Sequence, residues 1–180
     1  MKEKLVYKGP IFRVYQWKQR MFDGTYKTFE RAERPSSAEI IAVVGGRIAI
    51  AEERQPGGKG FIGLIGGRID EGETPLAAAK RELLEEAGMR AAGWKILRAF
   101  KSSSKKLKWD VYLLAALDCR RVGSQKLDSG ERIKVRYITL EELLDWGKDT
   151  ARIGPDIALY FNELRHDRGA RRRLERILGL

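Results

Sequence analysis

Cysteine and histidine are scarce in this sequence. Among 180 residues there is one cysteine, Cys119, and one histidine, His166. A single cysteine excludes an internal disulfide and favours a reducing, cytoplasmic location. Cys119 has no histidine near it in sequence, so we expect no catalytic thiol. His166 lies in an arginine-rich segment and is predicted to be a surface residue.

Long hydrophobic runs are also absent. No apolar segment approaches the length that spans a bilayer. The N-terminal residues 1–5 carry charges but no apolar region behind them, which argues against a signal peptide. A chain of this length fits one domain with a real core. We therefore expect a soluble cytoplasmic protein without a membrane partner.

Acidic residues are outnumbered by basic ones, 25 to 36, which gives a net charge of +11. Such an excess attracts polyanions, including nucleic acids and phosphorylated metabolites. The alternative is a solvated helix face, of the kind common in heat-adapted proteins. Charge alone does not separate the two interpretations. The basic clusters are Lys101, Lys105, Lys106 and Lys108; Arg120 and Arg121; and Arg165, Arg168, Arg171, Arg172, Arg173 and Arg176.

The first third of the chain has the pattern of strands and tight turns. Asp23-Gly24 between two alternating segments is a strong hairpin signal, and Gly45-Gly46 marks a second turn. The predicted strands are 6–14 with a break at Gly9-Pro10, 14–22, 25–33, 39–44, 47–51 and 61–64.

The periodicity then changes to that of a helix over Pro75–Ala87. Thr74 is a candidate N-cap, Pro75 suits the first helical position, and Gly88 is a stop signal. Strands bracketed by helices favour an α+β or α/β/α sandwich fold over a regular βαβ repeat. The remaining predicted elements are strands 94–99, 109–116 and 132–138, and helices 140–146 and 155–178, the last with Gly169 as its break point.

One face of the predicted helix carries three carboxylates. Glu82, Glu85 and Glu86 have the spacing i, i+3 and i+4, so they project together. Like charges repel, and a hard divalent cation such as Mg²⁺ removes that cost. Gly66-Gly67 is predicted to turn tightly and bring a backbone carbonyl near the metal. A solvated acidic helix face is the alternative interpretation.

The loop before the helix has a fixed spacing to these carboxylates. The whole segment 67–89 matches the Nudix box at every specified position, so the chain resembles the Nudix hydrolase family. The residues that carry the match are Gly67, Glu73, Arg81, Glu82, Glu85, Glu86 and Gly88.

The resemblance implies an α/β/α sandwich with a mixed sheet. It also implies hydrolysis of nucleoside diphosphates linked to another moiety, with Mg²⁺ or Mn²⁺. Glu73 and Arg81 would brace the loop and the helix around the catalytic carboxylates. The implied metal ligands are the carbonyl of Gly66 and the side chains of Glu82, Glu85 and Glu86.

Outside the box, the chain resembles the branch of ADP-ribose pyrophosphatases and nucleoside diphosphate sugar hydrolases. This resemblance implies Glu131, or second Asp128, as a general base on a loop that closes over the site. It implies phosphate binding by Arg34 and Arg54, although all of these can be plain surface residues. It also implies a homodimer formed through the strand meander 1–36, with the Nudix domain at 37–180.

Two segments depart from the branch. Gly63-Leu64-Ile65 stands where Glu-Leu-Pro is usual, and the segment 102–106 lacks a proline. Both lie on the substrate side, so the lysines of the second segment could meet extra phosphates. We therefore keep two alternatives to a nucleotide-sugar substrate. One is hydrolysis at RNA 5′ ends, and the other is a non-catalytic Nudix module that binds a nucleotide.

Overall fold

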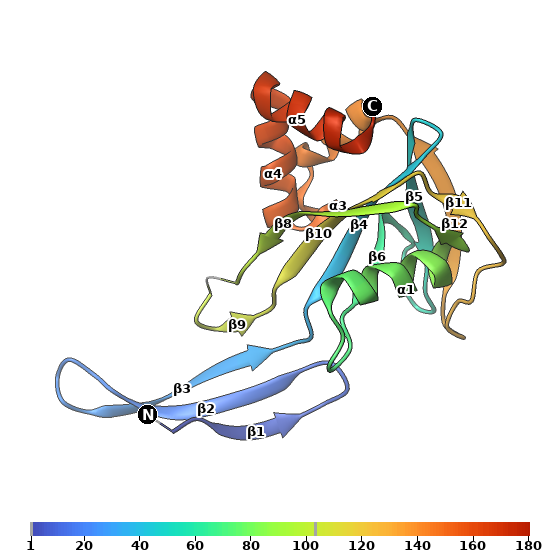
Figure 1. The fold of residues 1–180 in the computed structure, drawn as a ribbon. Helices are drawn as coiled ribbons and strands as arrows, with labels where there is room; N and C mark the ends of the chain where they lie inside the picture. Colours follow the sequence, from blue (N-terminus) through green and yellow to red (C-terminus); the bar gives the residue numbers. More distant parts are fainter. Residues whose placement is uncertain (1, 103) are drawn as a thin grey trace.

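The computed structural model describes residues 2–102 and 104–180. Its centre is a mixed six-stranded sheet with the order β12-β5-β6-β4-β10-β8 (Figure 1). β4 and β10 are parallel, and the other pairs in this sheet are antiparallel. The predicted α+β fold is confirmed. The strands are β4 Ser37–Val44, β5 Arg47–Arg54, β6 Phe61–Arg68, β8 Gly93–Phe100, β10 Val111–Leu117 and β12 Arg132–Ile138.

A second sheet is built from the N-terminal meander and projects from the main body (Figure 1). It contains β1 Lys4–Lys8, β2 Arg13–Arg20 and β3 Tyr26–Glu33, with the short β9 Leu107–Lys108 parallel to β3. The predicted turn at Asp23-Gly24 connects β2 to β3, with Thr25 donating its backbone N–H to Asp23. A two-residue pairing of β7 Met89–Arg90 with β11 Arg120–Arg121 completes the strands.

Helix α1 has the bounds Pro75–Ala87 that the sequence predicts. The Thr74 hydroxyl accepts the Ala77 backbone N–H at 3.1 Å, which satisfies one of the free donors at the helix start. Gly88 adopts the left-handed conformation with φ 64° and ends the helix. α1 therefore begins and ends through signals that are local in sequence.

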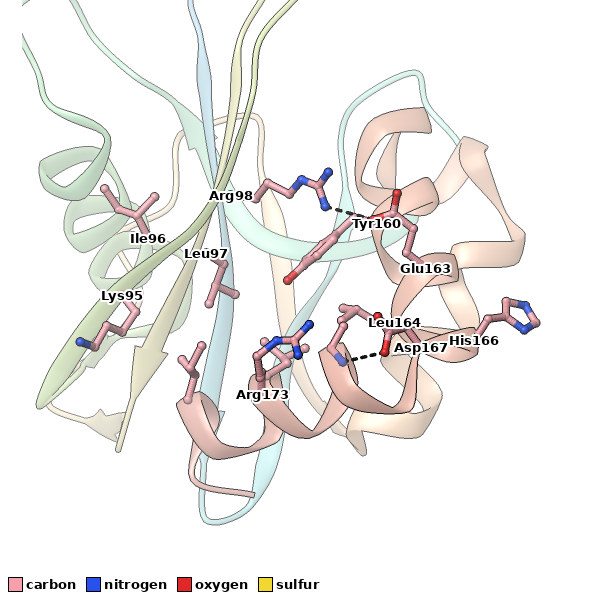
Figure 2. Close-up of a pocket in the computed structure, with 13 residues that line it drawn as sticks. Lys95, Ile96, Leu97, Arg98, Tyr160, Glu163, Leu164, His166, Asp167 and Arg173 are labelled. Carbon is pink, nitrogen blue, oxygen red and sulfur yellow. Dashed lines mark hydrogen bonds and ion pairs between the residues drawn. The ribbon is translucent and has the colours of Figure 1, made fainter.

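The C-terminal segment forms four helices after β12. Asp167 ends α4 and caps α5, accepting the backbone N–H of Gly169 and Ala170. The break predicted near Gly169 therefore lies two residues earlier, at Asp167, because the carboxylate of Asp167 accepts from the free backbone N–H groups at the start of α5. Figure 2 shows α4 and α5 around a cavity beside β8. The helices are α2 Leu140–Asp145, extended by a 3₁₀ turn Trp146–Lys148, α3 Thr150–Ile153, α4 Pro155–His166 and α5 Arg168–Leu178.

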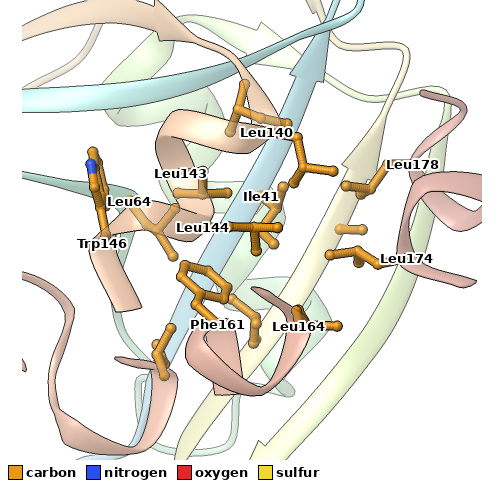
Figure 3. Packing of buried hydrophobic residues seen from close by; sticks show 14 of the residues in the cluster. Ile41, Leu64, Leu140, Leu143, Leu144, Trp146, Phe161, Leu164, Leu174 and Leu178 are labelled. Atoms are coloured by element: carbon orange, nitrogen blue, oxygen red, sulfur yellow. The ribbon is translucent and has the colours of Figure 1, made fainter. Parts of the chain in front are cut away.

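The main sheet buries both faces. Ile40 and Ala42 of β4 pack against α1, and Ile41 and Val43 pack against the C-terminal helices. Alternate residues of a strand point to opposite faces, so a central strand covered on both sides is apolar throughout. Figure 3 shows the hydrophobic cluster between the sheet and the C-terminal helices, in which Phe161 is fully buried. No helix in the described part of the chain is both long and apolar enough to cross a membrane.

The predicted tight turn at Gly66-Gly67 is wrong. Both residues lie inside β6, paired with Glu39 and Ala38 of β4. A Cβ atom on Gly66 would lie 2.2 Å from the carbonyl oxygen of Ala38, so the strands approach too closely for a side chain. Glycine is required here for close packing rather than for a turn.

Candidate active site

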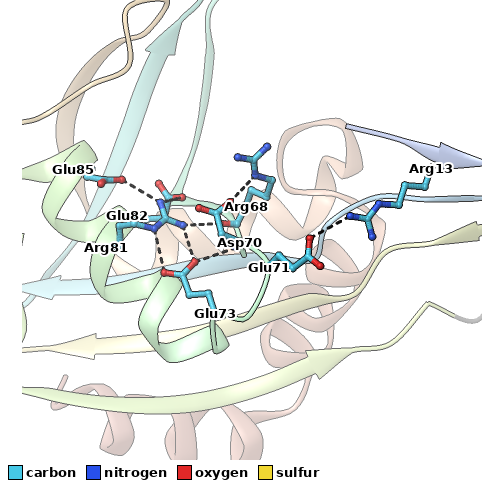
Figure 4. A network of polar contacts seen from close by, with 8 residues as sticks. All are labelled: Arg13, Arg68, Asp70, Glu71, Glu73, Arg81, Glu82 and Glu85. Carbon is cyan, nitrogen blue, oxygen red and sulfur yellow. Dashed lines mark hydrogen bonds and ion pairs between the residues drawn. The ribbon is translucent and has the colours of Figure 1, made fainter. Parts of the chain in front are cut away.

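Arg81 is the centre of a polar network that joins α1 to the loop before it (Figure 4). Its guanidinium donates to both carboxylate oxygens of Glu73, at 3.2 and 3.0 Å, and to the Arg68 carbonyl at 2.8 Å. The same group donates to Glu82 at 2.7 Å and to Glu85 at 3.1 Å. The structure therefore brings four of the predicted site residues into one network.

Glu86 lies at the contact between α1 and β6. Its carboxylate accepts the Gly66 backbone N–H at 3.1 Å. A Cβ atom on Gly67 would lie 2.4 Å from Glu82 Oε1. Two adjacent glycines without side chains thus allow two buried glutamates to approach the strand.

The electrostatics of this contact are unusual for helix carboxylates. Burial, together with the charges of Glu82, Glu53 and Glu131, raises the pKa of Glu86 to about 9. Burial also raises the pKa of Glu82, although Arg81 opposes the shift. The cluster therefore holds more negative charge than Arg81 can balance, and its carboxylates favour a proton or another cation.

Glu131 lies close enough to this cluster to interact with it. Its pKa is raised by burial and by the charges of Glu53, Asp128 and Glu85. Gln125, in the loop that precedes β12, bonds this loop to α1 and β12, because its amide donates to the carbonyls of Glu86 and Ile133. Asp128, the second candidate base, is exposed, and its carbonyl accepts the Glu131 backbone N–H.

Two acidic residues of the site were missed in the sequence. Glu53 of β5 is buried, accepts the Gln55 amide at 2.6 Å, and lies on the strand face that packs toward α1. Glu39 of β4 lies on the opposite face, and burial and the charge of Glu82 raise its pKa to about 7. For Glu39 the available signal was a carboxylate within an otherwise apolar strand, where burial of a charge is costly. Glu53 stands between Glu52 and Arg54 at the charged end of β5 and carried no such signal.

A cavity of about 470 Å³ opens beside Gly66. Glu39 and Glu53 lie in its lining together with apolar groups from β6, β10 and the start of α4. Lys101 also lines it, but its ammonium is bonded to Asp110 at 2.7 Å and to the Tyr112 hydroxyl. Lys101 is therefore held by neighbouring side chains, and the role of the lysines in segment 102–106 stays a prediction.

The two predicted phosphate-binding arginines lie in different places. The Arg34 guanidinium stacks over the Trp109 ring at 4.4 Å, and its Nε is buried without a hydrogen-bond partner. Arg54 ends β5, and its side chain is 73% exposed. The structure therefore does not gather Arg34 and Arg54 into one preformed phosphate cradle. His166 is exposed as predicted, whereas Cys119 is buried, and burial raises its pKa to about 11.

The chemistry of the donor set fits a hard divalent cation. All the acidic groups at the α1–β6 contact offer oxygen, which Mg²⁺ and Mn²⁺ prefer. Among residues 2–102 and 104–180, no three histidine, cysteine or carboxylate side chains stand ready to hold an ion. Glu82 and Glu85 are instead bonded to Arg81. Arg81 engages one oxygen of each of these carboxylates, so the second oxygen of each is left for a cation.

The protein has an α+β fold in which the glutamates of α1 pack against Gly66 and Gly67 of strand β6. The NUDIX domain model matches residues 34–157, so the chain belongs to the Nudix family and is a Nudix hydrolase. Members of this family generally use divalent metal ions.

Three known proteins are similar to this chain. It is 25% identical to an ADP-ribose pyrophosphatase of Bacillus subtilis, with 77% of each chain covered. It is 24% identical to a methanol dehydrogenase activator of Bacillus methanolicus, with 83% of this chain and 82% of the relative covered. The solved structure of an ADP compounds hydrolase matches with a TM-score of 0.69 and 20% identity, over 91% and 90% of the two chains. The last similarity concerns the fold alone.

Proposed function

We propose that this protein hydrolyses the phosphoanhydride bond of ADP-ribose or a related nucleoside diphosphate sugar, releasing a nucleoside monophosphate and a sugar phosphate. The observation that carries the proposal is the buried carboxylate cluster at the α1–β6 contact, with the pKa of Glu86 raised to about 9. The name of the Bacillus subtilis relative supports the choice of substrate.

In this proposal the cation is Mg²⁺, with Mn²⁺ as a substitute, and a reducing cytoplasm is the location. Held by the carboxylate cluster, such a cation would polarise the phosphoryl oxygens and make a water molecule more acidic. Arg81 and Glu73 fix the helix and the loop, since they form the densest part of the network. The proposed ligands are the Gly66 carbonyl, Glu82, Glu85 and Glu86.

Glu131 is the proposed general base. Its raised pKa makes it a stronger proton acceptor than an ordinary surface glutamate, and it lies within electrostatic reach of the cluster. Arg34 and Arg54 are proposed to bind substrate phosphates, because a guanidinium matches phosphate oxygens in planar geometry. The support is stronger for Arg34, whose Nε has no hydrogen-bond partner. Arg54 is supported only by the exposure of its side chain.

A homodimer through residues 1–36 is also proposed, with residues 37–180 as the catalytic domain. The β1–β3 sheet projects from the body (Figure 1). It exposes several large apolar side chains. Exposed apolar patches of this kind mark interaction surfaces. The exposed residues on this sheet and its turns include Leu5, Val6, Tyr7, Phe12, Phe22, Tyr26 and Phe29.

A release assay against a panel of phosphoanhydrides tests the proposal. The panel contains ADP-ribose, other nucleotide sugars, dinucleoside polyphosphates, nucleoside triphosphates and a 5′-triphosphate RNA, each with and without Mg²⁺. We expect metal-dependent cleavage of ADP-ribose or a nucleotide sugar. Cleavage of RNA alone, weakening steeply with salt, would instead favour the RNA alternative. Metal binding without any cleavage would favour the non-catalytic nucleotide module.

A further inference from the structure

Glu39 lines the 470 Å³ cavity that adjoins the carboxylate cluster. It is the register partner of Gly66 in the β4–β6 pair, and its Cα would lie 3.0 Å from a Cβ atom on Gly66. Glu82 is near enough for its charge to act on Glu39. A group bound by Glu39 would therefore be close to phosphates held at the α1–β6 contact.

No group among the described residues donates a hydrogen bond to the Glu39 carboxylate. None of the hydrogen bonds among the described residues involves its side chain, and its oxygens are not among the buried atoms that lack a partner. Both Glu39 oxygens are thus accessible from the cavity, whereas Glu53, which lines the same cavity, has one of its two oxygens occupied by the Gln55 amide. An accessible acceptor in a partly apolar cavity calls for a hydrogen-bond donor from a ligand.

The cations around this cavity are already partnered. Lys101 is bonded to Asp110 and Tyr112, and Arg152 stacks on the Trp146 ring at 5.0 Å and lies 3.9 Å from Asp149. The rest of the lining includes the apolar surfaces of Phe61 and Trp109 and two further carboxylates, Glu53 and Asp156, which repel a phosphate. The cavity therefore suits a neutral group with several donors and disfavours a phosphate.

We propose that Glu39 accepts hydrogen bonds from the paired hydroxyls of the sugar next to the pyrophosphate, and that the cavity rejects a sugar phosphorylated at those hydroxyls. This inference rests on the proposed function and names the part of the substrate that selects it. A sugar hydroxyl pair offers two neighbouring donors, which match the two oxygens of one carboxylate. Glu39 is thereby a specificity-determining residue, separate from the groups proposed to carry the chemistry.

The test compares wild type with Glu39→Gln and Glu39→Ala. The substrates are ADP-ribose, its analogues lacking a hydroxyl on one ribose or on the other, and the corresponding monophosphorylated forms. A site built to bind a hydroxyl rejects the deoxy analogue. For one of the two riboses, we expect wild type to prefer the hydroxylated substrate by roughly 10- to 100-fold in kcat/KM. We expect Glu39→Ala to lose that preference and Glu39→Gln to accept the phosphorylated form better.

Glu52→Gln is the matched control, because Glu52 is a glutamate of β5 that pairs with Arg136 and does not line the cavity. Binding of an α,β-methylene analogue of ADP-ribose, measured by calorimetry without metal, provides a second readout. Equal discrimination and equal binding in wild type and both Glu39 variants would overturn the inference. If wild type binds the analogue through Glu39 but cleaves nothing, the proposed function fails and the sugar site stands.

Discussion

Glu86 illustrates how a single residue can carry both a structural cost and a function. Its carboxyl is buried against Gly66, with Glu53, Glu82 and Glu131 around it. Removing a charge from water without a full partner is unfavourable. A leucine at this position would not carry this cost, so a buried glutamate here is a candidate for a functional role. A cation bound at this contact would remove the unfavourable free energy.

The metal-free protein is expected to lose stability as pH rises from about 5 to about 9. The folded-state pKa of Glu86 is about 9, above the ordinary value of 4.5, so the folded state binds the extra proton in this window. The free energy of unfolding then falls with rising pH. Thermal unfolding in EDTA measures it, and Mg²⁺ should raise the melting temperature more at pH 9 than at pH 5.5.

Glu86→Gln should flatten that pH profile above about pH 7, because the amide does not titrate, while Glu39, with a pKa of about 7, still contributes below it. Glu71→Gln, which alters an exposed glutamate of the preceding loop, should leave the profile unchanged. A profile that is equally steep in wild type and in Glu86→Gln would show that another group is responsible.

Glu131→Gln is expected to lower kcat by about 10²- to 10⁴-fold while changing KM little, which is the usual range for loss of a general base. Single-substrate kinetics on ADP-ribose with saturating Mg²⁺ provide the measurement. Asp128→Asn is the comparison within the same loop. An unaffected kcat for Glu131→Gln would assign the base to another group.

At the scale of elements, α1 was predictable residue for residue, whereas β6 was not. The bounds of α1 depend on Thr74, Pro75 and Gly88, whose signals act locally. The strand character of Gly66 and Gly67 depends on pairing with β4, which is distant in sequence. Local propensity for glycine favours a turn, and the tertiary contact overrides it.

Gly67→Ala tests the α1–β6 contact. The added methyl would lie 2.4 Å from Glu82 Oε1 and must push that side chain away. We expect Mg²⁺ affinity and kcat each to fall at least about tenfold, since misplaced ligands weaken a site. Gly58→Ala is the control, because its nearest neighbour lies at an ordinary 3.7 Å. Equal Mg²⁺ binding by the two variants would argue against Glu82 as a ligand.

At the scale of the whole molecule, the fold class and the box were readable from sequence, because periodicity and spacing record them. The contributions of Glu39 and Glu53 were not, since they depend on which strand face each residue occupies. The division into a meander 1–36 and a domain 37–180 stays a prediction. The same holds for the dimer, because it concerns contacts outside a single chain.

Association through the β1–β3 sheet is expected to be disrupted by Leu5→Glu combined with Phe29→Glu. Both side chains are 43% exposed in the single chain, so a charge there should prevent pairing without unfolding the monomer. Sedimentation velocity at micromolar concentration measures the change. Leu159→Glu, at an apolar α4 residue that is 61% exposed, is the control. A monomeric wild type would rule out the dimer.

The most direct test of the account is the cleavage of ADP-ribose by wild type and by Glu86→Gln, with Mg²⁺ and with EDTA. The account predicts metal-dependent release of AMP by wild type. It also predicts a loss of several orders of magnitude in Glu86→Gln, with the far-ultraviolet circular dichroism unchanged. Near-full activity of the variant, or equal activity in EDTA, would contradict the assignment of the α1 carboxylates to metal-dependent hydrolysis.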